Sequence, residues 1–154
     1  MIPTPLTGLK SAIRGEVLFG EPMAHHTSFA VGGPADAFAV PYDADDVLNI
    51  YDYSCKMHVP VLVIGGGTNL LVGDLGIRGI VMKVGKGLDE ICWEGDSVVV
   101  GGGVALSRFV SESVERNLAG LQYCYGIPGT VGGAVAMNAG TSAMYISRCV
   151  VEVG

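Results

Sequence analysis

The chain has 154 residues, the usual length of one domain. Hydrophobic residues make up 49% and charged residues 16%, which excludes a disordered, highly solvated polypeptide. The formal net charge is −6 and the nine basic residues are scattered, so we expect no nucleic-acid partner. There is no run of ~18 apolar residues and no signal-like start, so we expect a soluble, cytoplasmic protein with no membrane contact. Glycine is in excess, with 24 residues.

The cysteines are too far apart in the sequence to suggest a metal or redox motif. Cys55, Cys92, Cys124 and Cys149 include no Cys-x-x-Cys pair. We therefore expect no metal site and interpret all four as buried free thiols.

The first part of the chain predicts an arm, a strand and a helix. Residues 1–24 contain three prolines and no sustained periodicity, which is typical of an arm or short helix. Residues 38–40 are strand-like, and Asp43 then occupies the position of a helix N-cap. The apolar residues at helical spacing after it are expected to form the buried face; they are Val47, Leu48, Tyr51 and Cys55.

Four further strands and one more helix are predicted downstream. Residues 59–64 form an apolar, β-rich run typical of a strand buried on both faces, and residues 80–84, 97–100 and 149–153 are also strand candidates. One apolar stripe predicts the second helix; it consists of Leu106, Phe109, Val110, Val114 and Leu118. Because strands and helices mix without a regular βαβ period, the fold class is predicted to be α+β with two lobes.

Glycine-rich loops follow two of these strands: residues 65–69 come after the 59–64 strand, and the glycine triple 101–103 comes after the 97–100 strand. Residues 65–69, Gly-Gly-Gly-Thr-Asn, follow the first strand, and glycine there can turn successive N–H groups toward one anion. A tight turn between packed strands remains an equal alternative. Two common phosphate loops are excluded: the dinucleotide fingerprint needs glycine where Leu70 and Leu106 stand, and the P-loop needs glycine where Ile80 stands.

A third glycine-rich segment is the most informative. Residues 126–133 carry four glycines, Pro128, which restricts φ, and Thr130, which offers a hydroxyl group. Such a density of glycine would let the backbone approach a flat or charged ligand closely.

Taken together, these motifs resemble a known family. Thr-Ser-Phe-Ala-Val-Gly-Gly-Pro-Ala at 27–35, Val-Leu-Val-Ile-Gly-Gly-Gly-Thr-Asn-Leu-Leu at 61–71, Gly120 with Leu121, and Gly-Ile-Pro-Gly-Thr-Val-Gly-Gly-Ala at 126–134 occur in order. Met-Asn-Ala-Gly at 137–140 extends the last of them. The chain resembles the UDP-N-acetylenolpyruvoylglucosamine reductase family over residues 20–154.

The resemblance implies a fold and a chemistry. The fold is a two-lobed α+β FAD-binding domain of the vanillyl-alcohol-oxidase/PCMH type, with an N-terminal arm at 1–24, lobes at 25–84 and 85–154, and the substrate domain absent. Such a reductase converts UDP-N-acetylglucosamine enolpyruvate to UDP-N-acetylmuramate with hydride from NADPH, through non-covalent FAD, in cytoplasmic peptidoglycan synthesis. The chain by itself is expected to be inactive, with the UDP-sugar bound by the missing domain.

The resemblance also implies which residues bind the cofactor. Residues 65–69 would hold the FAD pyrophosphate. Residues 126–133 would line the opposite side of the site, near the phosphate or the flavin ring, and residues around 138–140 would lie beside them. The expected FAD-binding residues are Gly65, Gly66, Gly67, Thr68, Asn69, Gly126, Ile127, Pro128, Gly129, Thr130, Gly132, Gly133, Asn138 and Gly140. We expect no catalytic residue and no metal ligand, because the family's catalytic motifs lie downstream; Arg148 is interpreted as the partner of a surface carboxylate.

The chain departs from the family's pattern at one place, and two alternative functions stay open. Many relatives carry Ala-Tyr-Gly after the motif that ends at Gly140, whereas this chain has Thr141, Ser142 and Ala143. Alternatives also stay open: a stand-alone FAD-binding module, or an FAD-linked 2-hydroxy-acid oxidoreductase of the same fold. The oligomeric state is not predicted.

Several other residues are interpreted as structural. The two adjacent histidines are expected to have a surface or capping role, the aromatic residues to pack, and the aspartate either to form a turn or to contact ribose. These residues are His25, His26, Trp93, Tyr123, Tyr125 and Asp74.

Overall fold

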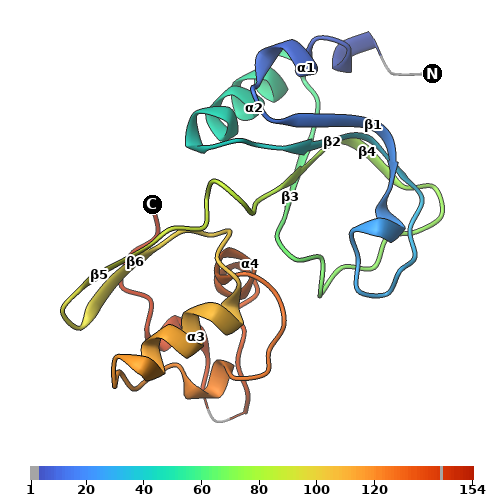
Figure 1. The fold of residues 1–154 in the computed structure, drawn as a ribbon. Helices are drawn as coiled ribbons and strands as arrows, with labels where there is room; N and C mark the ends of the chain where they lie inside the picture. Colours follow the sequence, from blue (N-terminus) through green and yellow to red (C-terminus); the bar gives the residue numbers. More distant parts are fainter. Residues whose placement is uncertain (1–3, 143) are drawn as a thin grey trace.

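The computed structural model describes residues 4–142 and 144–154, which form two lobes (Figure 1). Residues 1–3 of the predicted arm, and Ala143, lie outside the described residues. The first lobe contains a four-stranded sheet of order β1-β2-β4-β3, in which only the β1–β2 pair is antiparallel. Its elements are η1 (Thr4–Leu6), α1 (Leu9–Ala12), β1 (Glu16–Pro22), η2 (Met23–His25), β2 (Pro34–Val40), α2 (Ala44–Met57), β3 (Val61–Ile64) and β4 (Ile77–Lys83).

The second lobe is built around an antiparallel hairpin. Its elements are β5 (Ile91–Glu94), β6 (Ser97–Val100), α3 (Leu106–Glu115), η3 (Gln122–Cys124), α4 (Val131–Ala136) and η4 (Ile146–Arg148). Three of the five residues of the predicted stripe, Leu106, Phe109 and Val110, are buried on α3. Val114 is exposed, and Leu118 lies beyond the end of the helix.

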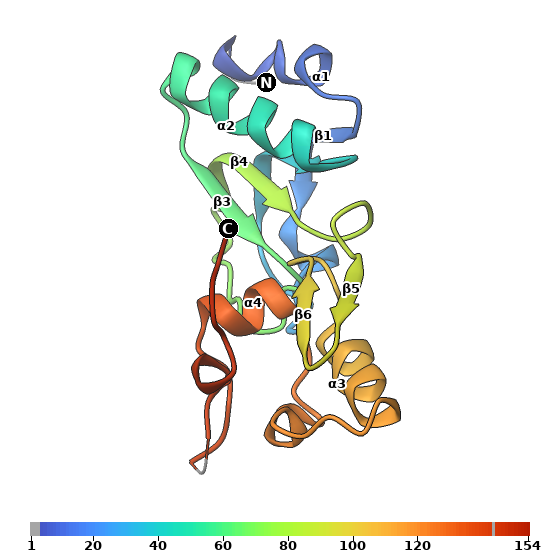
Figure 2. The same cartoon turned by 90° about the vertical axis from the view of Figure 1, so that its left-hand side faces the viewer.

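Separate apolar cores cover the two faces of the first sheet. Figures 1 and 2 place α1 and α2 on one face, where Leu9 and Ile50 pack against sheet residues such as Ala37 and Ile80. The other face packs Phe38 with residues of the chain on either side of the first glycine loop. This second core fixes where the carboxyl end of β3 and the loop after it lie.

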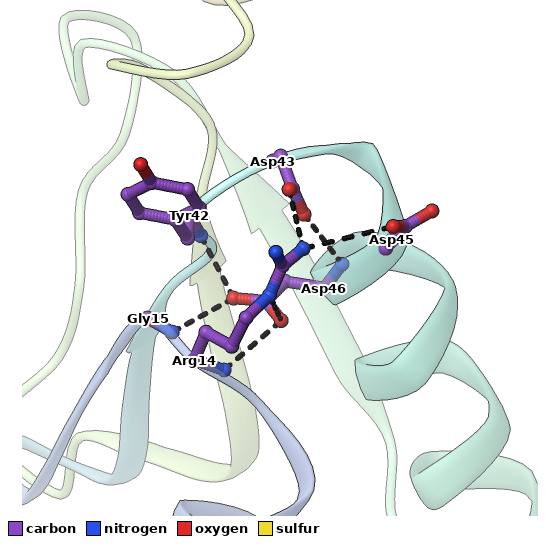
Figure 3. A network of polar contacts seen from close by, with 6 residues as sticks. All are labelled: Arg14, Gly15, Tyr42, Asp43, Asp45 and Asp46. Atoms are coloured by element: carbon purple, nitrogen blue, oxygen red, sulfur yellow. Dashed lines mark hydrogen bonds and ion pairs between the residues drawn. The ribbon is translucent and has the colours of Figure 1, made fainter.

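The start of α2 is held by the predicted cap and by a buried carboxylate (Figure 3). Asp43 Oδ1 accepts a hydrogen bond from the Asp46 amide at 3.2 Å, which confirms the N-cap. Asp46 is fully buried and accepts from the amides of Arg14 at 3.0 Å, Gly15 at 2.7 Å and Tyr42 at 2.9 Å. Burial acts to raise the pKa of Asp46, but these hydrogen bonds outweigh it and lower the pKa below its usual value.

The buried face of α2 differs from the predicted one. Ile50 and Asp46 are buried, whereas Leu48 and Tyr51 are more than 60% exposed and Cys55 is also exposed; of the predicted face only Val47 packs against the core. The apolar periodicity was misleading because the buried face includes a carboxylate. Asp46 is on that face because it accepts the three backbone hydrogen bonds there.

Two predicted strands and the arm also need correction. Residues 16–22 of the predicted arm form β1, an edge strand that pairs with β2. The 59–64 strand is not buried on both faces: β3 pairs only with β4 among the described strands, and Val63 is 56% exposed. Residues 149–153 form no strand, and Val151 and Val153 are exposed.

The prediction that all four cysteines are buried is wrong. Cys124 is buried, but Cys55, Cys92 and Cys149 are exposed free thiols. Cys55 lies on α2 and Cys92 on β5, whereas Cys149 directly follows η4.

Candidate functional site

The first glycine loop, residues 65–69, leaves the carboxyl end of β3 and packs closely against the chain after η2. Gly67 has a φ of +64°, and a Cβ there would overlap the carbonyl oxygen of His26. The amide of Ser28 donates to the Gly67 carbonyl at 3.1 Å. The loop therefore requires glycine at this position for both its conformation and its packing.

The glycine-rich segment at residues 126–133, which we call the second glycine loop, lies directly against the first loop. The residues in contact are 60 positions apart in the sequence. Thr68 Oγ1 donates to the carbonyl of Pro128 at 3.2 Å. A Cβ on Gly66 would lie 3.3 Å from Cα of Gly129, and a Cβ on Gly65 would overlap the Thr130 hydroxyl group. The structure thus brings together the two loops that the sequence predicts to form one site.

The second loop leads into α4, whose first turn is fixed within the protein. Thr130 is the N-cap, and its hydroxyl accepts a hydrogen bond from the Gly133 amide at 3.2 Å. The Gly132 amide donates to the carbonyl of Gly102 at 2.9 Å, in the glycine triple that follows β6. Figure 2 shows α4 between the end of β3 and the β5–β6 hairpin, so it holds the second loop at the junction of the lobes.

The amides of the first loop are unpaired within the part of the chain that the structure describes. No N–H group of residues 65–69 donates a hydrogen bond to any part of the chain that the structure describes. Backbone N–H groups in a packed region are normally paired, and successive unpaired ones form an anion-binding concavity. Neither loop contains a charged side chain, so an anion would be held by peptide dipoles and hydroxyl groups.

The second loop offers fewer amides. Ile127, Val131, Gly132 and Gly133 donate to protein acceptors. Within the described residues, the N–H groups of Gly126, Gly129 and Thr130 have no such acceptor. Gly132 and Gly133 therefore have a structural role through their amides, and contact with a cofactor by their other atoms stays a prediction.

The structure separates Asn138 and Gly140 from the two loops. Both follow the carboxyl end of α4, and a six-residue helix rises about 9 Å between its ends. The side-chain oxygen of Asn138 accepts a hydrogen bond from the Ser147 amide at 3.3 Å, and a Cβ on Gly140 would overlap the carbonyl of Met144. These contacts hold the segment before η4 in place, and the predicted role of the two residues in binding FAD is untested.

The departure after Gly140 lies in the same segment. Thr141 donates its amide to the carbonyl of Met144 at 2.9 Å, and Ser142 is exposed. Arg148 belongs to η4 and forms no ion pair with the described residues, so its expected surface pair is not observed.

The sequence did not predict a site role for the segment before β2. His26 and Ser28 contact Gly67, and buried Thr27 donates its hydroxyl to the Val31 carbonyl at 2.9 Å, which closes a tight turn. Gly102 was also missed as the packing partner of Gly132. The motif at 27–35 was the available signal, since it occurs in the same order as the two glycine loops.

The predictions for the histidines and the tryptophan agree with the structure. His26 is the C-cap of η2, and both histidines contact Oε1 of Glu21, at 3.2 Å for His25 and 3.0 Å for His26. The hydrogen bond with His25 contributes most to lowering the pKa of Glu21. Trp93 packs beside Phe109 with ring centroids 5.8 Å apart.

Of the two tyrosines, one packs as predicted and the other does not, and Asp74 forms a turn. Tyr123 packs against the second core, whereas Tyr125 is 84% exposed and does not pack as predicted. Asp74 lies in a turn closed by the Gly76 amide and the Gly73 carbonyl, which favours the turn over a contact with ribose. No cluster of potential metal ligands, and no helix long and apolar enough to span a bilayer, occurs in residues 4–142 and 144–154.

Comparison with known proteins finds a match to the FAD binding domain family over residues 35–153. The chain is 46% identical over 144 residues to the UDP-N-acetylenolpyruvoylglucosamine reductase of Bacillus subtilis, covering 94% of this chain and 48% of that protein. It is 50% identical over 133 residues to the reductase of the same name from Geobacter metallireducens, covering 86% and 44%. The chain thus spans about half the length of these relatives.

Solved structures of related fold also match this chain. The crystal structure of UDP-N-acetylenolpyruvylglucosamine reductase from Thermus caldophilus matches with a TM-score of 0.71 and 30% identity, over 88% of this chain and 46% of that one. A cholesterol oxidase from Brevibacterium sterolicum matches in fold alone, with a TM-score of 0.67 and 18% identity over 91% of this chain and 27% of that one. The predicted α+β fold of the vanillyl-alcohol-oxidase/PCMH type is confirmed.

Proposed function

The chain belongs to the FAD binding domain family, and from this premise we propose that it is the FAD-binding part of a UDP-N-acetylenolpyruvoylglucosamine reductase. The reaction would convert UDP-N-acetylglucosamine enolpyruvate to UDP-N-acetylmuramate with NADPH, in the cytoplasm, during peptidoglycan synthesis. The observation that carries the proposal is the meeting of two glycine loops at the lobe junction, one of which has five consecutive unpaired amides.

The residues present fit FAD. The amides of residues 65–69 suit a pyrophosphate, which bears negative charge and accepts several hydrogen bonds. The Gly126, Gly129 and Thr130 amides have no acceptor among the described residues and would bind a neighbouring part of the cofactor. The absence of Cβ atoms at Gly65 and Gly66 keeps the loops close enough to contact one ligand from both sides.

When bound, the flavin supplies the hydride chemistry that protein side chains cannot perform. The chain's own residues bind and orient it. Gly67 fixes the first loop on the turn at 27–31, and Thr130 fixes the second loop on α4. We assign no catalytic role to these residues; the groups that bind the UDP-sugar and deliver a proton would belong to the other half of a protein of the relatives' length.

The first experiment measures cofactor binding by the 154-residue chain. Titration with FAD should shift the visible absorbance and quench the flavin fluorescence, and FAD should bind more tightly than riboflavin because the loops recognise the pyrophosphate. Gly66→Ala should weaken FAD binding about tenfold, or about 1.4 kcal/mol, because it forces the loops apart. Gly73→Ala is the matched control, since nothing lies within 4 Å of a Cβ there. Equal affinity for riboflavin and FAD would contradict the proposed role of the first loop.

The second experiment tests the reaction. A chimera would join this chain to the part of the Bacillus subtilis reductase that the match does not cover. In the matched part, the two proteins are 46% identical. We expect it to oxidise NADPH only when the enolpyruvyl sugar is present. A chimera that binds FAD but oxidises NADPH equally without the sugar would favour a general FAD-binding module or an oxidoreductase with another substrate.

A further inference from the structure

Two histidines at the end of η2 share one carboxylate oxygen. Oε1 of Glu21, near the end of β1, lies 3.2 Å from Nδ1 of His25 and 3.0 Å from Nε2 of His26. The Glu21 and His26 side chains are 20% and 16% exposed, whereas the His25 side chain is 66% exposed. The contact between Glu21 and His26 is therefore the one of the two that is shielded from solvent.

The direction of these hydrogen bonds follows from the charge of Glu21. The hydrogen bond with His25 contributes most to lowering the pKa of Glu21, so the carboxylate is ionised at neutral pH. An ionised carboxylate can only accept hydrogen bonds, so both imidazole rings donate to it. Because both contacts use the same oxygen atom, a glutamine side chain would keep the acceptor and remove the charge.

The ring of His26 also packs on the apolar core beside the first glycine loop. It stacks on Phe38, with ring centroids 3.9 Å apart and an angle of 20° between the planes. Phe38 is 1% exposed and belongs to the core that contains Ile64 and Val72, which lie before and after the loop. The stack holds one face of the ring, and the hydrogen bond from Nε2 to Glu21 holds its edge.

The backbone of the same histidine contacts the loop itself. A Cβ on Gly67 would lie 1.8 Å from the carbonyl oxygen of His26, and the Ser28 amide donates to the Gly67 carbonyl at 3.1 Å. The His26 amide donates to the Met23 carbonyl at 2.9 Å. One residue thus contacts Glu21 with its side chain and the first glycine loop with its backbone.

We propose that Glu21 is a positioning residue for cofactor binding: it holds His26 so that the backbone at 26–28 keeps the first glycine loop in the shape that receives the FAD pyrophosphate. The inference rests on the proposed function, in which the unpaired amides of residues 65–69 bind that pyrophosphate. Successive N–H groups bind one anion only while they converge on it, so a displaced loop loses affinity. Glu21 acts through His26 and has no catalytic role.

The test compares FAD and riboflavin binding by variants of the native 154-residue chain. Glu21→Ala removes the acceptor and should weaken FAD binding about tenfold, while riboflavin, which has no pyrophosphate, should bind within about twofold of its original affinity. Glu21→Gln should restore FAD binding to within about twofold of the unsubstituted chain, since the accepting oxygen is retained. Glu16→Ala is the matched control, because Glu16 is exposed at the start of the same strand, and it should leave FAD binding unchanged.

His26→Phe tests the same connection from the other side. Phenylalanine can still stack on Phe38 but cannot donate to Glu21, so this variant should weaken FAD binding by about the same factor as Glu21→Ala. The double variant should bind no more weakly than either single one, because the two residues act through one contact. Far-UV circular dichroism checks that each variant is folded; if Glu21→Ala is not, His26→Phe decides the test.

Three results would overturn the proposal while leaving FAD binding by the first loop intact. They are equal FAD affinity of Glu21→Ala and Glu16→Ala, a loss in Glu21→Gln as large as that in Glu21→Ala, and additive losses in the double variant. An unsubstituted chain that binds FAD no more tightly than riboflavin would instead contradict the proposed role of the first loop, and this inference with it.

Discussion

Replacing Asp46 with asparagine should destabilise the first lobe although the two side chains have nearly the same shape. In the structure Oδ1 of Asp46 accepts from the Arg14 amide, and Oδ2 accepts from the amides of Gly15 and Tyr42 (Figure 3). Asparagine keeps one oxygen and replaces the other by an NH₂ group. At least one backbone N–H would then face a donor, and no water can replace the lost acceptor because the side chain is fully buried.

The size of the effect follows from these contacts. A hydrogen bond to a charged group contributes about 1.5–3 kcal/mol, and a buried donor left without an acceptor costs about 1–3 kcal/mol. Asp46→Asn should therefore lower the free energy of unfolding at neutral pH by about 2–4 kcal/mol, measured by urea denaturation with circular dichroism. Asp45→Asn is the matched control: its carboxylate is 81% exposed and 3.6 Å from the Arg14 guanidinium, so it should lose less than about 1 kcal/mol.

The pH dependence provides a second check. The pKa of Asp46 is lower in the folded chain than the usual value of about 3.9 in an unfolded one. Its stabilisation is therefore fully present above pH of about 4 and is lost as the pH falls through the lower, folded value. The difference between the unsubstituted chain and Asp46→Asn should be constant from neutral pH to about 4 and then shrink. A constant difference at all pH values, or a loss no larger than that of Asp45→Asn, would refute the reasoning.

Two further predictions concern the loop contact and the single tryptophan. Gly65→Ala should displace the Thr130 hydroxyl group from the α4 cap and cost about 1 kcal/mol by urea unfolding; Thr130→Ala should cost a similar amount, and the double variant should lose less than the sum. Gly73→Ala should be neutral, and an additive double variant would contradict the contact. Trp93 Nε1 donates to Glu112 Oε2 at 3.2 Å, and this bond contributes most to lowering the pKa of Glu112. Trp93 fluorescence should titrate with a midpoint below the ordinary glutamate value, and Glu112→Gln should remove that transition.

Sequence patterns were reliable where the signal was local. The N-cap at Asp43, the buried residues of α3 and the strands at β2, β4 and β6 follow from hydrogen-bonding side chains, helical spacing and β-branched runs within a few residues. β1 and β5 were not predicted as strands, and residues 149–153 were predicted as one wrongly. Whether a segment becomes a strand depends on a partner that hydrogen-bonds to it, and neither composition nor alternation identifies that partner.

The sequence by itself determined that glycine is concentrated in the loops at residues 65–69 and 126–133. The order of its motifs indicated the family. Only the tertiary structure decided that these loops, 60 residues apart, touch through Thr68 and Pro128, and that Asn138 and Gly140 lie at the far end of α4. It also decided which amides stay unpaired in the loops, and that the Tyr123 hydroxyl donates to Sγ of Cys149. The reason is physical: conformational freedom is a property of each residue, whereas pairing depends on which distant backbone the fold places within hydrogen-bonding distance.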